Sequence, residues 1–197
     1  MAKRRAASSS GQTNQVRVIG GRWRGRRLMF PSLDGLRPTP DRLRETLFNW
    51  LAPELHGARC LDLFAGSGVL GIEAVSRGAQ SAVLVDNQSA VVQQLRATVD
   101  SVGGDSISII MASGLDWLAR WSPESPPFDL VFVDPPYHCG LVADSVGVIE
   151  RVGCLAPGAW IYIETGTDEM LPPLPPHWRL HREKSAGQVA SYLFQRD

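Results

Sequence analysis

Cysteine and long apolar runs are both scarce in this chain, and each scarcity excludes a class of protein. The three cysteines, Cys60, Cys139 and Cys154, lie far apart and form no C-x-x-C pair. This spacing argues against a disulfide framework and a zinc site, and it indicates a reducing cytosol. No apolar run approaches the ~20 residues of a transmembrane helix, and no apolar stretch of a secretory signal follows the basic N-terminus. We therefore expect a cytoplasmic protein with no metal and no membrane segment, and a monomer by default.

The chain has enough length and apolar material for one domain with a small appendage. It holds 197 residues, of which 44% are hydrophobic and 20% are charged, as is ordinary for a globular protein with a real core. The formal net charge is zero, but residues 1–50 carry eleven basic and three acidic side chains. This gives the first fifty residues a net charge of +8, so the remainder carries −8. A basic head on an acidic body indicates that a polyanion docks at one end.

The basic head divides into three parts. Residues 1–15 are polar and low in complexity, so we expect a disordered basic tail. Val16 to Phe30 has two β-like runs around Gly20-Gly21, which predicts a hairpin with a tight turn. From Asp41 onward the apolar residues follow helical spacing, with Asp41 as the N-cap or first-turn acid. We place the end of this N-terminal extension at residue 52 and the main domain at 53–197.

Two groups of residues in the extension are candidates for ligand contacts. The predicted hairpin interleaves four arginines with one tryptophan: Arg22, Trp23, Arg24, Arg26 and Arg27. Guanidinium groups suit phosphates and the ring suits base stacking, so these residues are candidates to bind nucleic acid, although an Arg-rich hairpin can also be a solvated surface. Thr39 and Arg42 lie where the predicted helix begins, a place where an anion or a carboxylate can dock.

Beyond residue 52, strands and helices alternate, which predicts an α/β fold with a mostly parallel sheet. The expected strands begin at Cys60 and cover Ala82–Asp86, Ser106–Met111, Phe128–Asp134 and Trp160–Glu164. The expected helices begin near Val69, carry the apolar face Val91, Val92, Leu95 and Val99, and cover Leu115–Trp121 and Leu141–Val152. Trp178–Glu183 and Val189–Gln195 alternate across K-S-A-G, which predicts an antiparallel pair at the sheet edge.

The most informative stretch is F-D-L-V-F-V-D-P-P-Y, residues 128–137. It predicts a buried strand that ends at Asp134, because Pro135 and Pro136 cannot donate ladder hydrogen bonds. Ligands of open α/β sheets bind at the carboxyl ends of the strands. Asp134 and the Pro135 carbonyl are acceptors that can hold the two N–H bonds of an exocyclic base amine and steer it toward a methyl group. Tyr137 can stack on a base that has left its helix. A proline-stiffened turn with no such role is the alternative.

Two further acids follow predicted strands upstream. In C-L-D-L-F-A-G-S-G-V-L-G, Asp62 precedes a glycine loop, which suits a ligand carrying an ammonium group, as S-adenosylmethionine does at its methionine end. Asp86 follows the next strand about 20 residues later, where a carboxylate meets ribose hydroxyls in nucleoside-binding folds. Ser113 and Gly114 follow the third strand and are candidates to border an adenine ring.

Taken together, the motifs resemble those of class I S-adenosylmethionine-dependent methyltransferases. They are more closely similar to those of the RsmD family, bacterial methyltransferases of guanine N2 in 16S rRNA. The most specific motifs are V-R-V-I-G-G-R-W-R-G-R-R-L, L-R-P-T-P-D-R-L-R-E-T-L-F-N-W-L and H-R-E-K-S-A-G-Q-V, and the resemblance covers Val16 to Arg196. The family pattern R-P-T-T-D-R has a second threonine where this chain has Pro40, so a hydroxyl has no role at that position here.

The resemblance implies a Rossmann-like class I fold with a seven-stranded, mostly parallel sheet, an antiparallel C-terminal strand pair, and an RNA-contacting hairpin and helix extension. It implies S-adenosyl-L-methionine bound by Asp62, Phe64, Gly66, Gly68, Asp86, Ser113 and Gly114. We also expect Thr39 and Arg42 to bind the cofactor. Asp134, Pro135, Pro136 and Tyr137 are then expected to hold a flipped guanine of 16S rRNA, in the small ribosomal subunit or an assembly intermediate.

Three alternatives remain open from the sequence. The D-P-P-Y motif can bind any exocyclic amine, so a DNA adenine-N6 or cytosine-N4 methyltransferase is the nearest alternative. Such an enzyme, however, needs a longer target-recognition domain. A non-catalytic ribosome-assembly RNA-binding protein with a vestigial cofactor site is the second. A nicotinamide dehydrogenase is the weakest, because nothing resembles its substrate domain. The affinity for S-adenosylmethionine and the nucleic acid that accepts the methyl group separate these alternatives.

Overall fold

The computed structural model describes residues 13–32 and 39–197. Most of the predicted basic tail lies outside these residues, as does Arg37 of the basic head. The last three residues of that predicted tail are not disordered, because strand β1 already begins at Thr13. They are ordered by ladder pairing with β2, which residue composition does not reveal. In the described part of the chain, no helix combines the length and the apolar character that crossing a membrane requires.

The predicted seven-stranded sheet is confirmed, with the strand order β5-β4-β3-β6-β7-β9-β8. Five parallel strands are followed by an antiparallel C-terminal pair. The strands are β3 (Arg59–Asp62), β4 (Ser81–Asp86), β5 (Ile107–Met111), β6 (Phe128–Val133), β7 (Leu155–Gly166), β8 (Trp178–Ala186) and β9 (Val189–Arg196). The strand β7 is longer than predicted, because its first residues pair with the start of β6 across a register shift.

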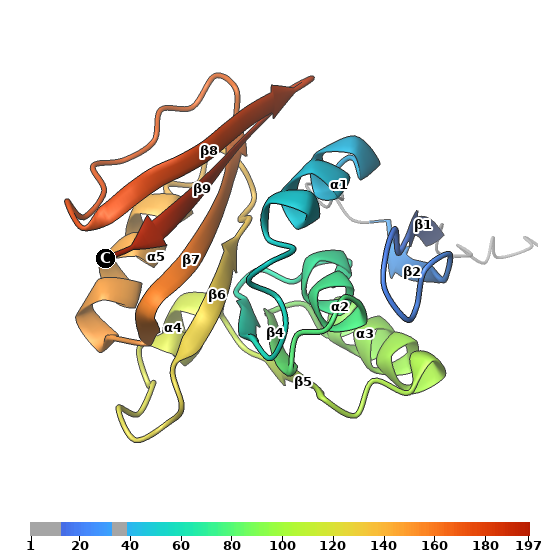
Figure 1. Cartoon of the computed structure of the whole chain (residues 1–197). Helices are drawn as coiled ribbons and strands as arrows, with labels where there is room; N and C mark the ends of the chain where they lie inside the picture. Colours follow the sequence, from blue (N-terminus) through green and yellow to red (C-terminus); the bar gives the residue numbers. More distant parts are fainter. Residues whose placement is uncertain (1–12, 33–38) are drawn as a thin grey trace, which may run out of the picture.

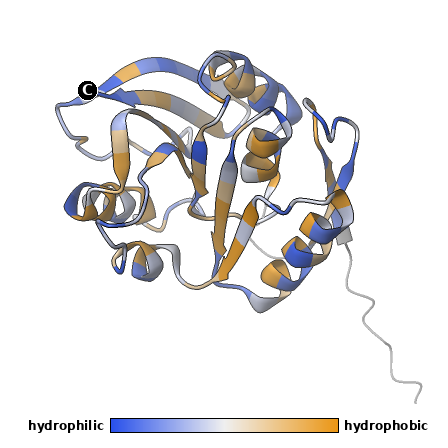
Figure 2. Ribbon diagram, turned by 60° about the horizontal axis from the view of Figure 1, so that its bottom comes forward, coloured by the Kyte–Doolittle hydropathy of each residue, from blue (hydrophilic) through white to orange (hydrophobic). Residues whose placement is uncertain are grey.

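Helices cover both faces of the sheet (Figure 1). Helices α1 (Asp41–Trp50), α2 (Val69–Ser76) and α3 (Ser89–Val102) contribute buried residues to the core on one face. Helices α4 (Gly114–Leu118) and α5 (Leu141–Val152) contribute to the core on the other face. In Figure 2 the central strands are mostly hydrophobic, as expected for parallel strands buried on both sides. The predicted apolar face of α3 is buried as expected.

An aromatic group fixes α1 against the centre of the sheet. The Phe48 ring lies 6.2 Å from Phe132, which lies 6.2 Å from Tyr162 on the neighbouring strand. All three side chains are fully buried. Each such ring contributes roughly 1.5–3 kcal/mol through burial. This packing fixes the last turn of α1 on the sheet, while Thr39, just before the helix, contacts Glu164 near the end of β7.

The N-terminal hairpin forms as β1 (Thr13–Arg17) and β2 (Arg27–Pro31), but its connection is longer than the predicted tight turn. Gly20 and Gly21 do not form the tight turn of the hairpin. They instead allow the loop to approach the end of α2. A Cβ atom on Gly21 would lie 1.8 Å from the Ser76 carbonyl oxygen. The Ser76 hydroxyl donates to the Gly20 carbonyl at 2.6 Å and accepts the Trp23 N–H at 2.9 Å. The glycine pair therefore allows docking onto the main domain.

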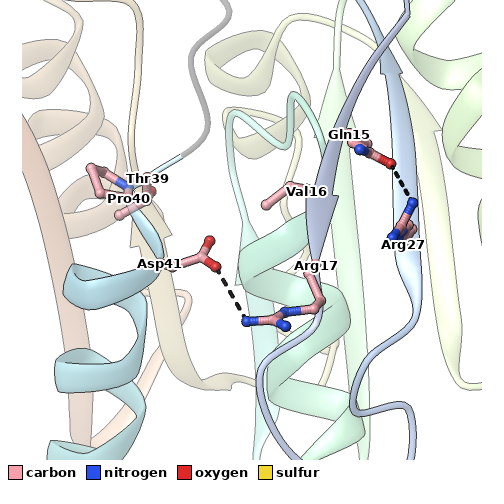
Figure 3. Close-up of a pocket in the computed structure, with 7 residues that line it drawn as sticks. All are labelled: Gln15, Val16, Arg17, Arg27, Thr39, Pro40 and Asp41. Carbon is pink, nitrogen blue, oxygen red and sulfur yellow. Dashed lines mark hydrogen bonds and ion pairs between the residues drawn. The ribbon is translucent and has the colours of Figure 1, made fainter.

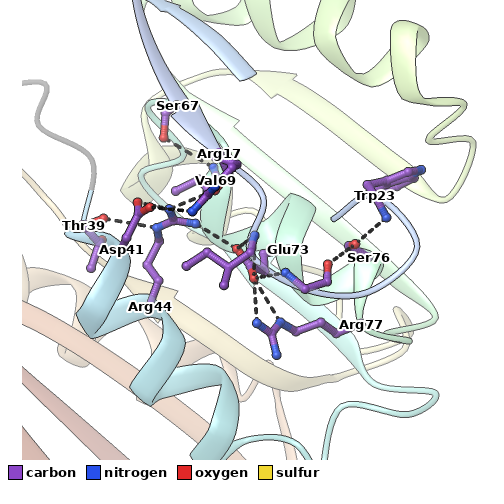
Figure 4. A network of polar contacts seen from close by, with 12 residues as sticks. Arg17, Trp23, Thr39, Asp41, Arg44, Ser67, Val69, Glu73, Ser76 and Arg77 are labelled. Carbon is purple, nitrogen blue, oxygen red and sulfur yellow. Dashed lines mark hydrogen bonds and ion pairs between the residues drawn. The ribbon is translucent and has the colours of Figure 1, made fainter. Parts of the chain in front are cut away.

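A buried ionic network joins the hairpin, α1 and α2 (Figure 4). Glu73 of α2 accepts hydrogen bonds from Arg44 of α1 at 2.8 Å and from Arg77 at 2.9 Å. It also accepts the backbone N–H of Gly20 at 2.9 Å. Arg44 and Glu73 are completely buried, and Arg44 also donates to Asp41 at 2.6 Å. This hairpin network, Asp41, Arg44, Glu73 and Arg77, ties the basic extension to the helix that begins at the glycine loop.

Candidate active site

Five strands deliver polar residues to one edge of the sheet. Asp62 ends β3, Asp86 ends β4 and Asp134 directly follows β6. Glu164 lies near the end of β7, and Ser113 follows β5. Because parallel strands end at the same edge, the chain brings these side chains to one region. The sequence predicted this for all of them except Glu164.

The glycine loop joins the first two acids. Gly66 donates its N–H to Asp86 Oδ2 at 3.0 Å, and Gly71 donates to Asp62 Oδ2 at 3.1 Å. Gly68 precedes α2 with a φ of 73°, in the left-handed region where glycine carries no steric cost. The loop thus passes directly over the ends of β3 and β4, and the half-buried Phe64 is part of it.

Ser113 and Gly114 lie against the end of β3. A Cβ atom on Gly114 would lie 2.4 Å from the Leu63 carbonyl oxygen, so only glycine permits this approach. The Ser113 hydroxyl accepts the N–H of Asp116 and caps the short helix α4. The cofactor-contacting roles predicted for these two residues stay predictions, but the geometry brings them beside the glycine loop.

The D-P-P-Y segment borders a pocket. Its lining includes Pro135, Pro136 and Tyr137 together with Glu164 and Glu169. The pocket wall is held by Glu169, which accepts the N–H of His138 at 2.7 Å and of Gly166 at 2.9 Å. These bonds fix His138 at a φ of 61°, an unusual conformation for a residue other than glycine. The turn after the prolines is therefore rigidly held beside the pocket.

Burial and neighbouring acids raise the pKa values of the acids in this site. Burial, together with the nearby Asp86 and Glu164, raises the pKa of Asp62 to about 7, although the hydrogen bond from Gly71 opposes the shift. Burial, Glu164 and Asp62 raise the pKa of Asp134 well above its usual value. Burial also raises the pKa of Glu164 to about 7, although hydrogen bonds from Tyr162 and Thr39 oppose the shift. Crowded carboxyl groups with raised pKa values are typical of a site that receives a cation.

Thr39 and Arg42 lie at the start of α1, as predicted, but they differ in surroundings. Thr39 is buried, and its hydroxyl donates to Glu164 Oε1 at 2.7 Å. The sequence predicted that a carboxylate could dock at the start of this helix, and the carboxylate found there is the side chain of Glu164. Arg42 is exposed on α1. A contact of either residue with the cofactor stays a prediction.

The basic residues of the hairpin are exposed, whereas the tryptophan among them is buried. Arg22, Arg24, Arg26 and Arg27 are exposed, as phosphate contacts require. Trp23 was predicted to stack on bases, and this is wrong: its side chain is only 7% exposed and belongs to the core. The Arg22 guanidinium lies 4.2 Å from the centre of its ring. Trp23 is buried because the hairpin packs on α2, and the sequence pattern does not predict this packing.

A hollow separates the hairpin from the start of α1 (Figure 3). It is lined by Gln15, Val16, Arg17, Arg27, Thr39, Pro40 and Asp41. Arg17 spans it toward Asp41 at 3.9 Å, and Arg27 donates to Gln15 at 3.5 Å. Thr39 connects this basic hollow to the acidic site, because its hydroxyl reaches Glu164 on the other side.

Sequence reasoning missed Glu164, Glu169 and the Arg44–Glu73 pair. A signal for Glu164 was present, because W-I-Y-I-E is an apolar strand that ends in an acid, as do those ending at Asp62 and Asp86. For Glu169 and the buried pair no local pattern exists. Each of them depends on at least one partner that lies 29 to 54 residues away in the chain.

The strand order, the glycine loop and the row of acids define a class I methyltransferase fold. Residues 16–195 match the family described as Conserved hypothetical protein 95. Ribosomal RNA small subunit methyltransferase D of Escherichia coli (strain K12) is 47% identical over 185 residues, covering 94% of this chain and 92% of that protein. The protein of the same name in Haemophilus influenzae is 42% identical over 92% of this chain and 94% of its own length.

A solved structure agrees with these sequence matches. The candidate methyltransferase yhhF from Escherichia coli superimposes with a TM-score of 0.82 at 46% identity, covering 93% of this chain and 99% of that one. The chain belongs to the RsmD family of methyltransferases, as its motifs led us to expect.

Proposed function

We propose that this protein transfers a methyl group from S-adenosyl-L-methionine to the exocyclic N2 of one guanine in 16S rRNA. The relatives named small-subunit ribosomal RNA methyltransferases support the substrate class. The observation that carries the proposal is the position of D-P-P-Y beside a pocket, at the same sheet edge as the glycine loop. We expect the protein to act as a cytoplasmic monomer on the small subunit or an assembling particle.

The residues at the sheet edge fit S-adenosylmethionine. Its sulfonium supplies an electrophilic methyl group, and both the sulfonium and the ammonium are cationic. Burial and neighbouring acids raise the pKa values of Asp62 and Asp134. A cation beside these two groups would favour their ionised form. Asp86 would meet the ribose hydroxyls, and Ser113 and Gly114 would border the adenine. Phe64, Gly66 and Gly68 would form the loop around it.

In this proposal, the D-P-P-Y residues position the amine. Asp134 and the Pro135 carbonyl accept its two N–H bonds, while Tyr137 stacks on the flipped base and Pro136 stiffens the turn. As the new N–C bond replaces the methyl–sulfur bond, the donor would leave as the neutral thioether and the nitrogen would lose one proton. Asp134 is a suitable acceptor for that proton because its pKa is raised. Positioning supplies up to ~7–11 kcal/mol of the barrier reduction. Stacking at about 1–3 kcal/mol per base partly offsets the cost of flipping.

The exposed arginines Arg22, Arg24, Arg26 and Arg27 are proposed to hold the RNA phosphates. They lie on the extension that the buried Glu73 ties to α2, the helix that follows the glycine loop. The base-holding pocket and the phosphate-holding surface are thus parts of one rigid frame. Such a frame fixes how far the flipped guanine lies from the RNA backbone that the hairpin holds.

The first experiment is methyl transfer from labelled S-adenosylmethionine to small ribosomal subunits that lack the modification, with naked 16S rRNA and duplex DNA in parallel. The proposal expects label recovered as N2-methylguanine from the subunits. Label found only in DNA, as N6-methyladenine or N4-methylcytosine, contradicts it. Cofactor binding with no label in any substrate would instead favour the non-catalytic assembly protein.

The variant Asp134→Ala tests the role of D-P-P-Y. Without the carboxylate the amine loses an acceptor and an orienting group, so turnover should fall by at least about 10²-fold. The affinity for S-adenosylmethionine, measured by calorimetry, should change far less. Normal turnover in Asp134→Ala would remove this residue from the proposed chemistry.

A further inference from the structure

Glu164 is the one buried acid of the site for which the proposed function has no use. The residue is 1% exposed, yet it lines the same pocket as Pro135 and Tyr137. Burying a carboxyl group is costly unless its oxygens have hydrogen-bond partners. The groups that engage one of its oxygens, and the ligand groups that the other can accept, indicate a role for it.

The two hydroxyl groups that hold Glu164 both donate to the same oxygen. Thr39 Oγ1 and Tyr162 Oη each lie 2.7 Å from Oε1. Both donors are themselves buried, and Thr39 comes from a segment 125 residues away. The carboxyl group is thus fixed in one orientation through Oε1, which leaves Oε2 as the atom whose hydrogen-bonding capacity a ligand can use.

Glu164 lies directly beside Asp134. Val133 of β6 is paired with Ile163 of β7 in a parallel ladder, so the residues that follow them, Asp134 and Glu164, are neighbours on adjacent strands. Their side chains leave the sheet on the same face, since side chains alternate along both strands. Glu164 raises the pKa of Asp134, as expected for close carboxyl groups. Glu164, which lines the pocket, and Asp134, which follows the neighbouring strand, are therefore two adjacent acceptors.

Two adjacent acceptors need two adjacent donors on the base, and among the bases with an exocyclic amine only guanine has a ring N–H next to that amine. Guanine carries an N–H donor at N1 next to its N2 amine. Adenine and cytosine instead carry a bare ring nitrogen, an acceptor, next to their exocyclic amine. Asp134 with the Pro135 carbonyl suits any such amine, whereas a second carboxylate beside it repels the ring nitrogen of adenine or cytosine.

We propose that Glu164 is the residue that selects guanine, with its Oε2 accepting the N1–H of the flipped base while Asp134 holds the N2 amine. This inference rests on the proposed function and adds to it the residue that distinguishes guanine from other bases. Thr39 and Tyr162 are positioning residues, because they orient the carboxylate without touching the base. Glu169, the other acid of the pocket, is occupied by the N–H groups of His138 and Gly166.

The variant Glu164→Gln changes one atom of this contact. The amide oxygen can still accept both hydroxyl groups, so the amide nitrogen takes the place of Oε2 and turns an acceptor into a donor. The test uses small subunits reconstituted with either guanine or 2-aminopurine at the position that the labelling experiment identifies. 2-Aminopurine keeps the 2-amino group but has a bare nitrogen at N1.

The full-length wild-type protein should methylate guanine at least about 10- to 100-fold faster than 2-aminopurine. Glu164→Gln should lose about 10- to 100-fold on guanine and lose or reverse the preference. Its affinity for S-adenosylmethionine and its thermal midpoint should stay close to wild type. The control Glu169→Gln, which neutralises the other acid of the pocket, should keep the preference for guanine.

The outcomes separate this inference from the proposed function. If the wild type makes no N2-methylguanine, the proposed function fails. If the wild type does so and Glu164→Gln keeps the same preference for guanine over 2-aminopurine, only the role of Glu164 fails. Should Glu164→Gln not fold, Glu164→Asp keeps an acceptor and must still prefer guanine. A preference for 2-aminopurine in Glu164→Asp would overturn the inference.

Discussion

At the residue scale, the acids at the sheet edge make stability depend on pH. The pKa of Asp62 is raised from its usual value to about 7 by burial and by Asp86 and Glu164. A carboxyl group with a higher pKa in the folded state holds its proton more tightly there. Its contribution to stability is therefore complete below the unfolded pKa and is lost as the pH rises through about 7.

We expect the free energy of unfolding of the ligand-free protein to fall between pH 5 and pH 8, as measured by urea denaturation. Asp62→Asn removes one of the titrating groups, so its stability should fall less steeply over the same window. Equal slopes for the two proteins would contradict the assigned shift. The cationic cofactor should also bind more tightly at pH 8 than at pH 6, because the acids around it are then ionised.

At the element scale, the hairpin network couples the extension to α2. Glu73→Gln leaves the fully buried Arg44 with less compensation and weakens the bonds to the hairpin loop. Breaking a buried ion pair in this way costs about 3–5 kcal/mol. Urea denaturation measures the loss, with Glu45→Gln as the control. Glu45 is exposed on α1, so its variant should stay within about 0.5 kcal/mol of wild type.

Gly21 gives a sharper test of docking. In Gly21→Ala, the new Cβ would meet the Ser76 carbonyl oxygen at 1.8 Å, so the loop must leave α2. The control is Gly25→Ala, which has a similar φ of 85° but nothing within 4 Å of the added atom. We expect Gly21→Ala to bind small subunits at least about 10-fold more weakly than Gly25→Ala, with cofactor affinity unchanged in both. Equal subunit binding by the two variants would show that docking on α2 does not position the hairpin.

At the scale of the whole molecule, opposite charges are separated between the basic N-terminal extension and the rest of the chain, with +8 on residues 1–50 and −8 on the remainder. The exposed hairpin arginines can attract phosphates, and the acids at the sheet edge can attract a cation. The buried Thr39 lies between them and contacts the acidic side. Binding of RNA should therefore depend on salt much more strongly than binding of the cofactor.

Replacing exposed hairpin arginines should reduce that salt dependence. Each arginine that no longer neutralises a phosphate lowers the slope of log affinity against log salt by about 0.7–0.9. The double variant Arg24→Ala/Arg26→Ala should thus have a slope shallower by about 1.4–1.8 in a filter-binding titration with subunits. Arg120→Ala, at an exposed position beyond α4, is the matched control and should keep the wild-type slope. Equal slopes for the two variants would show that Arg24 and Arg26 do not contact RNA phosphates.

The sequence by itself determined most strands and helices of the main domain and the row of acids at the strand ends, although it missed the start of β7 and placed the end of the short helix α4 at Trp121 rather than Leu118. These follow from local physics: apolar runs stopped by acids, glycines and prolines define where each element ends. Asp62, Asp86 and Asp134 lie where that reasoning predicts, and the helix Leu141–Val152 begins and ends as expected. The specific motifs also indicated the family.

Only the tertiary structure decided which polar groups meet. The burial of Trp23, the pairing of Arg44 with Glu73, and the contact of Thr39 with Glu164 all join segments far apart in the chain. No periodicity encodes such contacts, because they depend on how the hairpin and α1 pack on a sheet that must form first. The sequence therefore located the D-P-P-Y motif, whereas the fold placed a second carboxylate, Glu164, beside it.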